Sequence, residues 1–151
     1  MSNEMFTARF EDFVPRALQT AFNYVDGCDA VETIWIVGHR DGDWATGGAV
    51  YRLHGLVVPP FDVVKADPSL DNSVENQMSL QPIGREAGDL LLMDRDNGPT
   101  RFVVRYDVAA QTMNADFYYE PLRMGPEDTL TELYDAWVKR LQETGNDSAD
   151  D

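Results

Sequence analysis

The chain has 151 residues, 43% of them hydrophobic, and this length and composition predict a single globular domain. It carries 27 Asp and Glu against 12 Lys and Arg, a formal net charge of −15. This charge argues against nucleic acid and anionic membranes as partners, because both need cations to neutralise their phosphates. It favours a basic protein partner, although a proteome that is acidic throughout would give the same excess.

Cysteine content and hydropathy indicate a compartment. A single cysteine, Cys28, excludes an intrachain disulfide and a cysteine-based zinc cluster, and it fits a reducing environment. The opening MSNEMFTARFEDF contains acids and no apolar run, so it does not indicate a signal peptide. No apolar run approaches the roughly 20 residues that span a bilayer. We therefore expect a cytoplasmic protein.

The first half of the chain predicts a helix followed by a strand. Apolar side chains recur at steps of three and four from about residue 10 to residue 26. Proline is tolerated in the first turn of a helix, so Pro15 sets the expected start near Asp12, and Gly27 is the expected stop. Val31–His39 then alternates with apolar residues on both faces, which predicts a central strand covered on both sides.

A second strand is predicted over Thr46–Val58, with a bulge at Gly47-Gly48 and an end at Pro59-Pro60.

The region after this strand has weaker patterns. Residues 61–70 are expected to be irregular or a short edge strand. Two short helical pieces should flank Pro82, the second over Arg85–Met93, and Asp94–Pro99 should be a loop.

Residues Thr100–Pro121 predict a β-hairpin, because side chains alternate between an apolar and a more polar face. The apolar face contains Phe102, Val104, Tyr106 and Val108 on the first strand and Met113, Ala115, Phe117 and Tyr119 on the second.

A final amphipathic helix should open at Pro126, because proline and acids are favoured in a first turn. Residues 145–151, GNDSADD, are expected to be a disordered acidic tail that follows one domain over residues 1–144. The predicted fold is α+β, with a four-stranded, mostly antiparallel sheet of two hairpins. The N- and C-terminal helices should pack on its buried face, and short helices should join the hairpins.

Catalytic and metal-binding motifs are absent from the sequence. His39 and His54 could ligate a metal with acids of the first turn, but HExxH, CxxC, GxSxG and the phosphate-binding GxxxxGK[ST] are all missing. We therefore expect no catalytic residue, no metal and no cofactor. A deep pocket that held Arg101 or Arg105 with His54 would instead favour a small-ligand site.

Aromatic residues set among acids give the best binding signal, because such anchors are typical of protein-binding patches. Trp44 follows Asp41 and Asp43 in the first turn, and a tryptophan there can also fold back onto the core. Tyr118, for which partial cover by a helix is the alternative, shares a strand face with acids. The predicted partner-binding residues are Asp41, Asp43, Trp44, Asp116, Tyr118 and Glu120.

The order of these elements and their aromatic residues resembles a known family. A strand with tryptophan (ETIWIVGH) is followed by a strand with tyrosine (AVYRLHG), a helical link, the aromatic-rich pair FVVRYDVAAQTMNADFYYE and the helix LYDAWVKRL. Over Val31–Leu141 this pattern resembles the YezG-type immunity (antitoxin) family of bacterial polymorphic toxin systems. The resemblance implies a small, acidic, cytoplasmic, non-enzymatic protein that binds and blocks a toxin, often a nuclease. The alternative is an accessory domain that pairs with another protein, or with itself as a homodimer, through a sheet edge.

Overall fold

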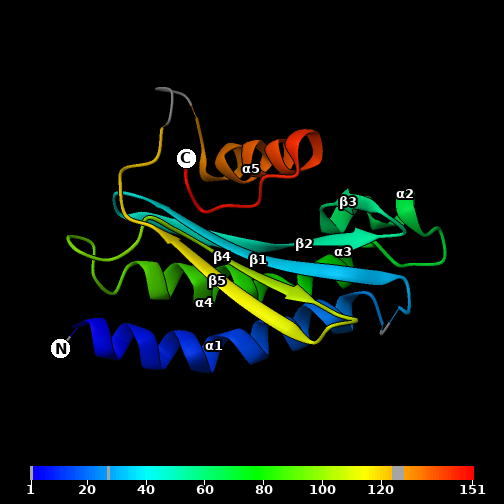
Figure 1. Ribbon diagram of the computed structural model, residues 1–151, viewed down its shortest axis with the longest axis horizontal. Helices are drawn as coiled ribbons and strands as arrows, with labels where there is room; N and C mark the ends of the chain where they lie inside the picture. Colours follow the sequence, from blue (N-terminus) through cyan, green and yellow to red (C-terminus); the bar gives the residue numbers. More distant parts are fainter. Residues whose placement is uncertain (1, 27, 124–127) are drawn as a thin grey trace.

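The computed structural model describes residues 2–26, 28–123 and 128–151, in which helices cover both faces of an antiparallel sheet (Figure 1). This arrangement confirms the α+β class and the antiparallel sheet. In chain order the elements are α1 (Ser2–Tyr24), β1 (Val31–Asp41), β2 (Trp44–Leu53), β3 (Leu56–Val58), the 3-10 helix η1 (Pro60–Asp62), α2 (Val63–Ala66), α3 (Val74–Met78), α4 (Gln81–Leu91), β4 (Arg101–Asp107), β5 (Thr112–Tyr118) and α5 (Leu130–Thr144).

Among the described residues the sheet has five strands, in the order β3-β2-β1-β4-β5, so the prediction of four strands is wrong. The predicted strand Thr46–Val58 is divided by a two-residue turn at His54-Gly55, where φ is 49° and 77°. Positive φ at both positions matches the twist of a tight hairpin, so the chain reverses there and β3 pairs back on β2. Residues 61–70, expected to be irregular or a strand, contain part of η1 and all of α2. The predicted central strand is confirmed as β1.

The two glycines expected to form a bulge instead allow close helix packing. The β1–β2 register is regular at Gly47 and Gly48, and its irregularity lies at the start of β1. A Cβ at Gly47 would lie 2.7 Å from the Cβ of Ala87 in α4. A Cβ at Gly48 would lie 3.1 Å from the Tyr134 ring in α5. Both faces of β2 therefore accept a helix at short range.

Helix α1 begins well before the predicted start at Asp12 and contains Pro15 in its interior. The rings of Phe6 and Phe10 stack 5.8 Å apart, and Phe10 lies 5.1 Å from Phe117 of β5. A proline inside a helix costs about 3 kcal/mol, and burial of aromatic surface in these extra turns offsets that cost.

Other helix boundaries agree in part with the expected ones. The helical pieces around Pro82 are α3 and α4, and the proline lies in the first turn of α4, which begins about a turn earlier than expected. The last helix begins after Thr129, whose side chain accepts a hydrogen bond of 3.3 Å from the Glu132 N–H. Gly27 and Pro126, the expected stop and start signals, lie outside the described residues.

The terminal helices lie on opposite faces of the sheet, so the expectation that they share one face is wrong (Figure 1). Both faces of β1 are apolar, and each therefore needs its own cover. The face that α1 and α4 cover includes Ile34, Ile36, Phe102 and Val104, and the face that α5 covers includes Trp35, Val37, Val50 and Val103.

The segment 145–151 differs from the expected disordered tail, because it folds back between α5 and the sheet (Figure 1). Gly145 ends α5 in a left-handed conformation with φ 74°, which reverses the chain. The side chain of Ala149 is then completely buried in the core on the α5 face.

Candidate protein-binding site

The predicted binding residues come from segments that the sheet brings to one end. The Arg40 N–H donates to the Thr100 carbonyl at 2.8 Å, and the Thr100 N–H donates to the Tyr118 carbonyl at 2.7 Å. The turn after β1 and the end of β5 are therefore aligned across the sheet, and the loop before β4 lies beside them (Figure 1). We call this region the loop end and define it as residues 41–44, 94–99 and 119–120.

The turn between β1 and β2 presents Trp44 to solvent. Its side chain is 73% exposed, so the alternative in which it folds back onto the core does not hold. Asp41 pairs directly with Trp44 in the register, so both side chains project on the face that α5 covers further along. Gly42, with φ 58°, makes the reversal tight, and Asp43 beside it is exposed.

The loop that follows α4 adds acids that the sequence analysis did not assign to the site. Arg95 contacts the Asp43 carboxylate at 2.7 Å and so joins this loop to the first turn. The Asp94 carboxylate accepts from the Asn97 N–H at 3.1 Å, which orders the loop, and Asp96 is exposed. The segment DRDNGP was predicted only as a connector, because nothing local indicates which strand ends lie beside it.

Two predicted site residues make contacts within the chain and are not fully exposed to a partner. The Asp116 carboxylate accepts from the Ala149 N–H at 2.7 Å and from the Phe117 N–H at 3.1 Å. Tyr118 packs against the core on the α5 face, as its alternative interpretation anticipated. Glu120, two residues after Tyr118, is exposed and belongs to the loop end.

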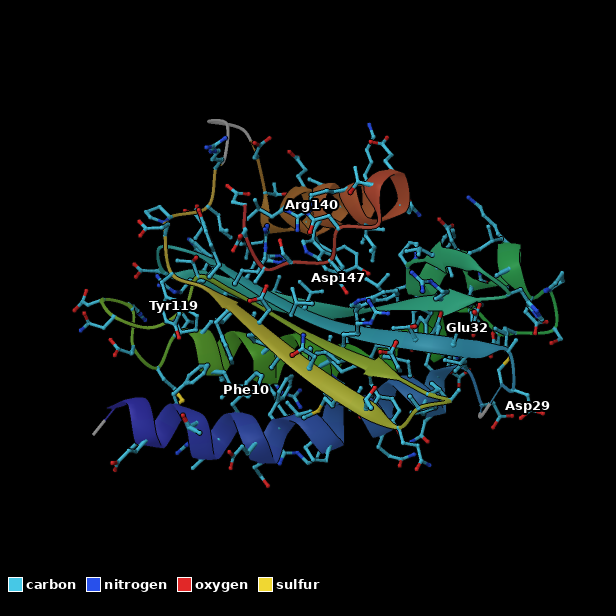
Figure 2. The ribbon with its side chains drawn as sticks, viewed as in Figure 1. Phe10, Asp29, Glu32, Tyr119, Arg140 and Asp147 are labelled. Carbon is cyan, nitrogen blue, oxygen red and sulfur yellow. The ribbon has the colours of Figure 1, made fainter. Side chains whose placement is uncertain are left out.

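Tyr119, which the sequence placed on the apolar face, is 59% exposed (Figure 2). It lines a hollow of about 400 Å³ together with Phe6, Asp94 and Pro99. The alternation along β5 directs it away from Tyr118, toward the α1 side. The loop end therefore carries an exposed aromatic residue near each face of the sheet.

The charge of the loop end is strongly negative. Its residues include five acids and one arginine, and that arginine already contacts Asp43. Elsewhere, Arg16 lies between Asp12 and Glu86. The pKa of Arg16 is raised chiefly by its hydrogen bond to Asp12. The loop end by itself carries four more acids than basic residues.

The two histidines lie at opposite ends of the β1–β2 hairpin and are not brought together. His39 is buried, and its Nε2 lies 2.9 Å from the Leu130 carbonyl, so this nitrogen carries the proton. Burial, with a further contribution from the charge of Arg101, lowers the pKa of His39 to about 4. His54 is exposed in the β2–β3 turn, 3.7 Å from the Asp67 carboxylate, whereas Arg101 pairs with His39 at the other end of the hairpin. Within the described residues, no group of three His, Cys, Asp or Glu side chains could hold a metal ion.

Comparison with known proteins adds no identification: no protein-family model matches the chain, and no curated protein matches it significantly. Of the helices in residues 2–26, 28–123 and 128–151, none is both long and apolar enough to cross a membrane.

Proposed function

We propose that this chain is a non-enzymatic, acidic protein-binding domain that docks on a basic surface of another protein through its loop end. The observation that carries the proposal is Trp44, a large aromatic side chain held 73% exposed between carboxylates. A tryptophan in such a position leaves a large apolar surface exposed to water, which is unfavourable unless a partner covers it. Tryptophan is also among the residues most enriched at binding hot spots.

The surrounding acids supply the expected selectivity for a basic partner. Asp41, Asp96 and Glu120 are exposed around the aromatic side chains and would form the polar rim of an interface. Carboxylates at a rim accelerate association with a positive surface and reject negative ones. With a net charge of −15, the whole chain strengthens this field.

We further propose that the partner is a toxin domain, such as a nuclease, and that the chain acts as an immunity protein. The support is the resemblance over Val31–Leu141 together with the acidic, aromatic character of the loop end. A nuclease groove is positively charged because it binds phosphates, and an acidic surface with aromatic anchors has the complementary chemistry.

The test is co-expression with a toxin domain encoded by a neighbouring gene, followed by titration calorimetry on the purified pair. The chain should restore growth, and Trp44→Ala should weaken binding by about 30-fold, the equivalent of a 2 kcal/mol hot spot. Phe61→Ala is the matched control, because Phe61 is an exposed aromatic residue in η1, outside the loop end. Equal killing with and without the chain would refute the toxin assignment, and equal losses for both variants would refute the loop end.

A specific feature favours one alternative, an accessory domain that pairs with another protein or with itself. Strand β5 is at the edge of the sheet, its residues 112–115 are exposed, and Met113 is 55% exposed. Such an edge can accept a strand from a second chain. Sedimentation equilibrium would then show a dimer that Met113→Lys disrupts, and a monomer over the micromolar range would exclude self-pairing.

A further inference from the structure

The segment 145–151 lies in a groove whose walls are unusually basic and aromatic for so acidic a chain. Figure 2 shows Asp147 between α5 and the sheet, with Arg140 of α5 close by. We call this the tail groove. Its walls are formed by Trp35, Arg101, Arg105, Asp116, Trp137 and Arg140.

One aspartate of the segment is specifically recognised. The Asp147 carboxylate accepts from the Trp35 indole N–H at 3.0 Å and from Arg105 Nη1 at 3.1 Å. Arg105 is in turn held by Asp107, whose carboxylate oxygens lie 3.1 and 3.2 Å from its Nε. Hydrogen bonds to a carboxylate are roughly twice as strong as neutral ones, so this position selects an acidic side chain.

The remaining contacts are made to peptide backbone. The Ser148 carbonyl accepts from the Trp137 indole N–H at 2.9 Å and from Arg140, which also reaches the Asp150 carbonyl at 2.6 Å. The Ala149 N–H donates to the Asp116 carboxylate at 2.7 Å, and its methyl group is fully buried. Any extended peptide offers the same backbone groups, so the groove reads an acid and, two residues later, a small side chain.

The chain's own segment leaves polar groups of the groove without good hydrogen-bond partners. Arg101 is only 3% exposed, yet its Nη1 lies 3.4 Å from two backbone carbonyls and 3.8 Å from the Asp151 carboxylate. Its Nε is buried and, like that of Arg140, has no hydrogen-bond partner in the described part of the chain. A cavity of about 270 Å³ also remains where Asp147 meets β4 and β5. A buried guanidinium without good acceptors is costly, so a ligand that supplies a closer carboxylate would bind better.

We propose that the tail groove is a binding site for an extended acidic peptide of a partner protein, which the chain's own residues 147–150 occupy and mask in this structure. The peptide is expected to carry aspartate at the position of Asp147 and alanine or glycine at that of Ala149. Charge complementarity supports this occupant, because three arginines line the groove in a chain with a net charge of −15. The groove is formed by residues other than those of the loop end, and its preference for acids differs from the basic partner proposed above.

The attached segment acts as an intramolecular competitor. A short tether holds a ligand at an effective concentration on the order of 1 mM. If the free segment binds with a dissociation constant of about 100 µM, the groove is open roughly one tenth of the time, which weakens an external peptide about tenfold.

The test uses the full chain and the fluorescein-labelled peptide TGNDSADD, with binding followed by fluorescence anisotropy. Ala149→Arg should expel the chain's own segment, because the methyl group is fully buried, and should tighten peptide binding about tenfold over the unsubstituted chain. Ala136→Arg is the matched control, because it makes the same change of charge at an exposed position of α5. Adding Arg105→Met to Ala149→Arg should abolish binding, because Arg105 contacts the Asp147 carboxylate at 3.1 Å. A peptide with Asn in place of each Asp should not bind.

Circular dichroism verifies that each variant is folded. Asp147→Arg should also expel the segment, because Arg105 repels the new charge, and it does not enlarge a buried side chain. It replaces Ala149→Arg in the test if that variant does not fold. Peptide binding by the expelled variants that equals that of Ala136→Arg would overturn the proposal. So would binding that survives the loss of Arg105, because the peptide would then occupy another site.

Discussion

Replacing Gly88 by alanine tests how closely α4 packs on the sheet beneath the loop end. A Cβ at this position would lie 2.7 Å from the Ala45 carbonyl oxygen, where ordinary van der Waals contact begins at 3.4 Å. The obstacle is the backbone of β2, one residue from Trp44, and it cannot turn aside as a flexible side chain would. Either the helix or the strand must move by several tenths of an ångström.

The magnitude follows from two opposing effects. Alanine in a helix interior is favoured over glycine by about 1 kcal/mol, whereas overpacking a tight contact costs about 1–3 kcal/mol. With backbone as the obstacle, we expect Gly88→Ala to lower the free energy of unfolding by about 1–2 kcal/mol and Tm by roughly 3–6 °C.

Urea titration followed by circular dichroism measures this change. Gly84→Ala, one turn earlier on the same helix, is the matched control, because its Cβ would lie 3.0 Å from the Gly47 carbonyl and should cost less. A Gly88→Ala variant as stable as the unsubstituted chain, or more stable, would refute the close packing of α4 on β2.

Three other substitutions probe the core, the surface and the buried histidine. Phe10→Ala should lose about 3–5 kcal/mol in urea titration, because its ring is buried edge-on against Phe102, and a loss below about 1 kcal/mol would contradict that packing. Trp44→Ala should change stability by less than about 0.5 kcal/mol, whereas Trp137→Ala on the α5 face should cost about 3–5 kcal/mol; similar losses for both would show that the turn tryptophan is not exposed. Since the folded-state pKa of His39, about 4, is below its unfolded value, the unfolded chain binds the extra proton and stability falls as the pH drops from about 6.5 to 4. His39→Gln should remove up to about 3 kcal/mol of this decline in urea titrations at successive pH values, and an unchanged pH dependence would contradict the assignment.

Local patterns predicted much of the fold. The apolar alternation on both sides of Val31–His39 identified the central strand, and the hairpin after Thr100 has the predicted strands. Its faces differ in part from the prediction, because Met113 and Tyr119 of the apolar face are exposed and Val103 of the other face is buried. The division of the second strand was missed, because a single His54-Gly55 pair gives a weak turn signal within a continuous apolar alternation.

The candidate site was partly visible in the sequence. The sequence singled out Trp44 because it lies among acids in a turn. The structure exposes this side chain to solvent, as one of the two interpretations required. Asp116 looked equivalent to Glu120, since both are acids on one face of a strand. They differ because the Ala149 N–H, thirty-three residues along the chain, donates a hydrogen bond to the Asp116 carboxylate and not to that of Glu120.

The sequence by itself determined the class of fold, the central strand and the acidic surface, because strand periodicity and net charge are properties of neighbouring residues and of their sum. Only the tertiary structure decided that the terminal helices cover opposite faces and that GNDSADD is ordered. The physical reason is that this segment has almost no apolar surface of its own. It is held through its backbone and Asp147 by arginine and tryptophan side chains from β1, β4 and α5, which are adjacent only after the chain has folded.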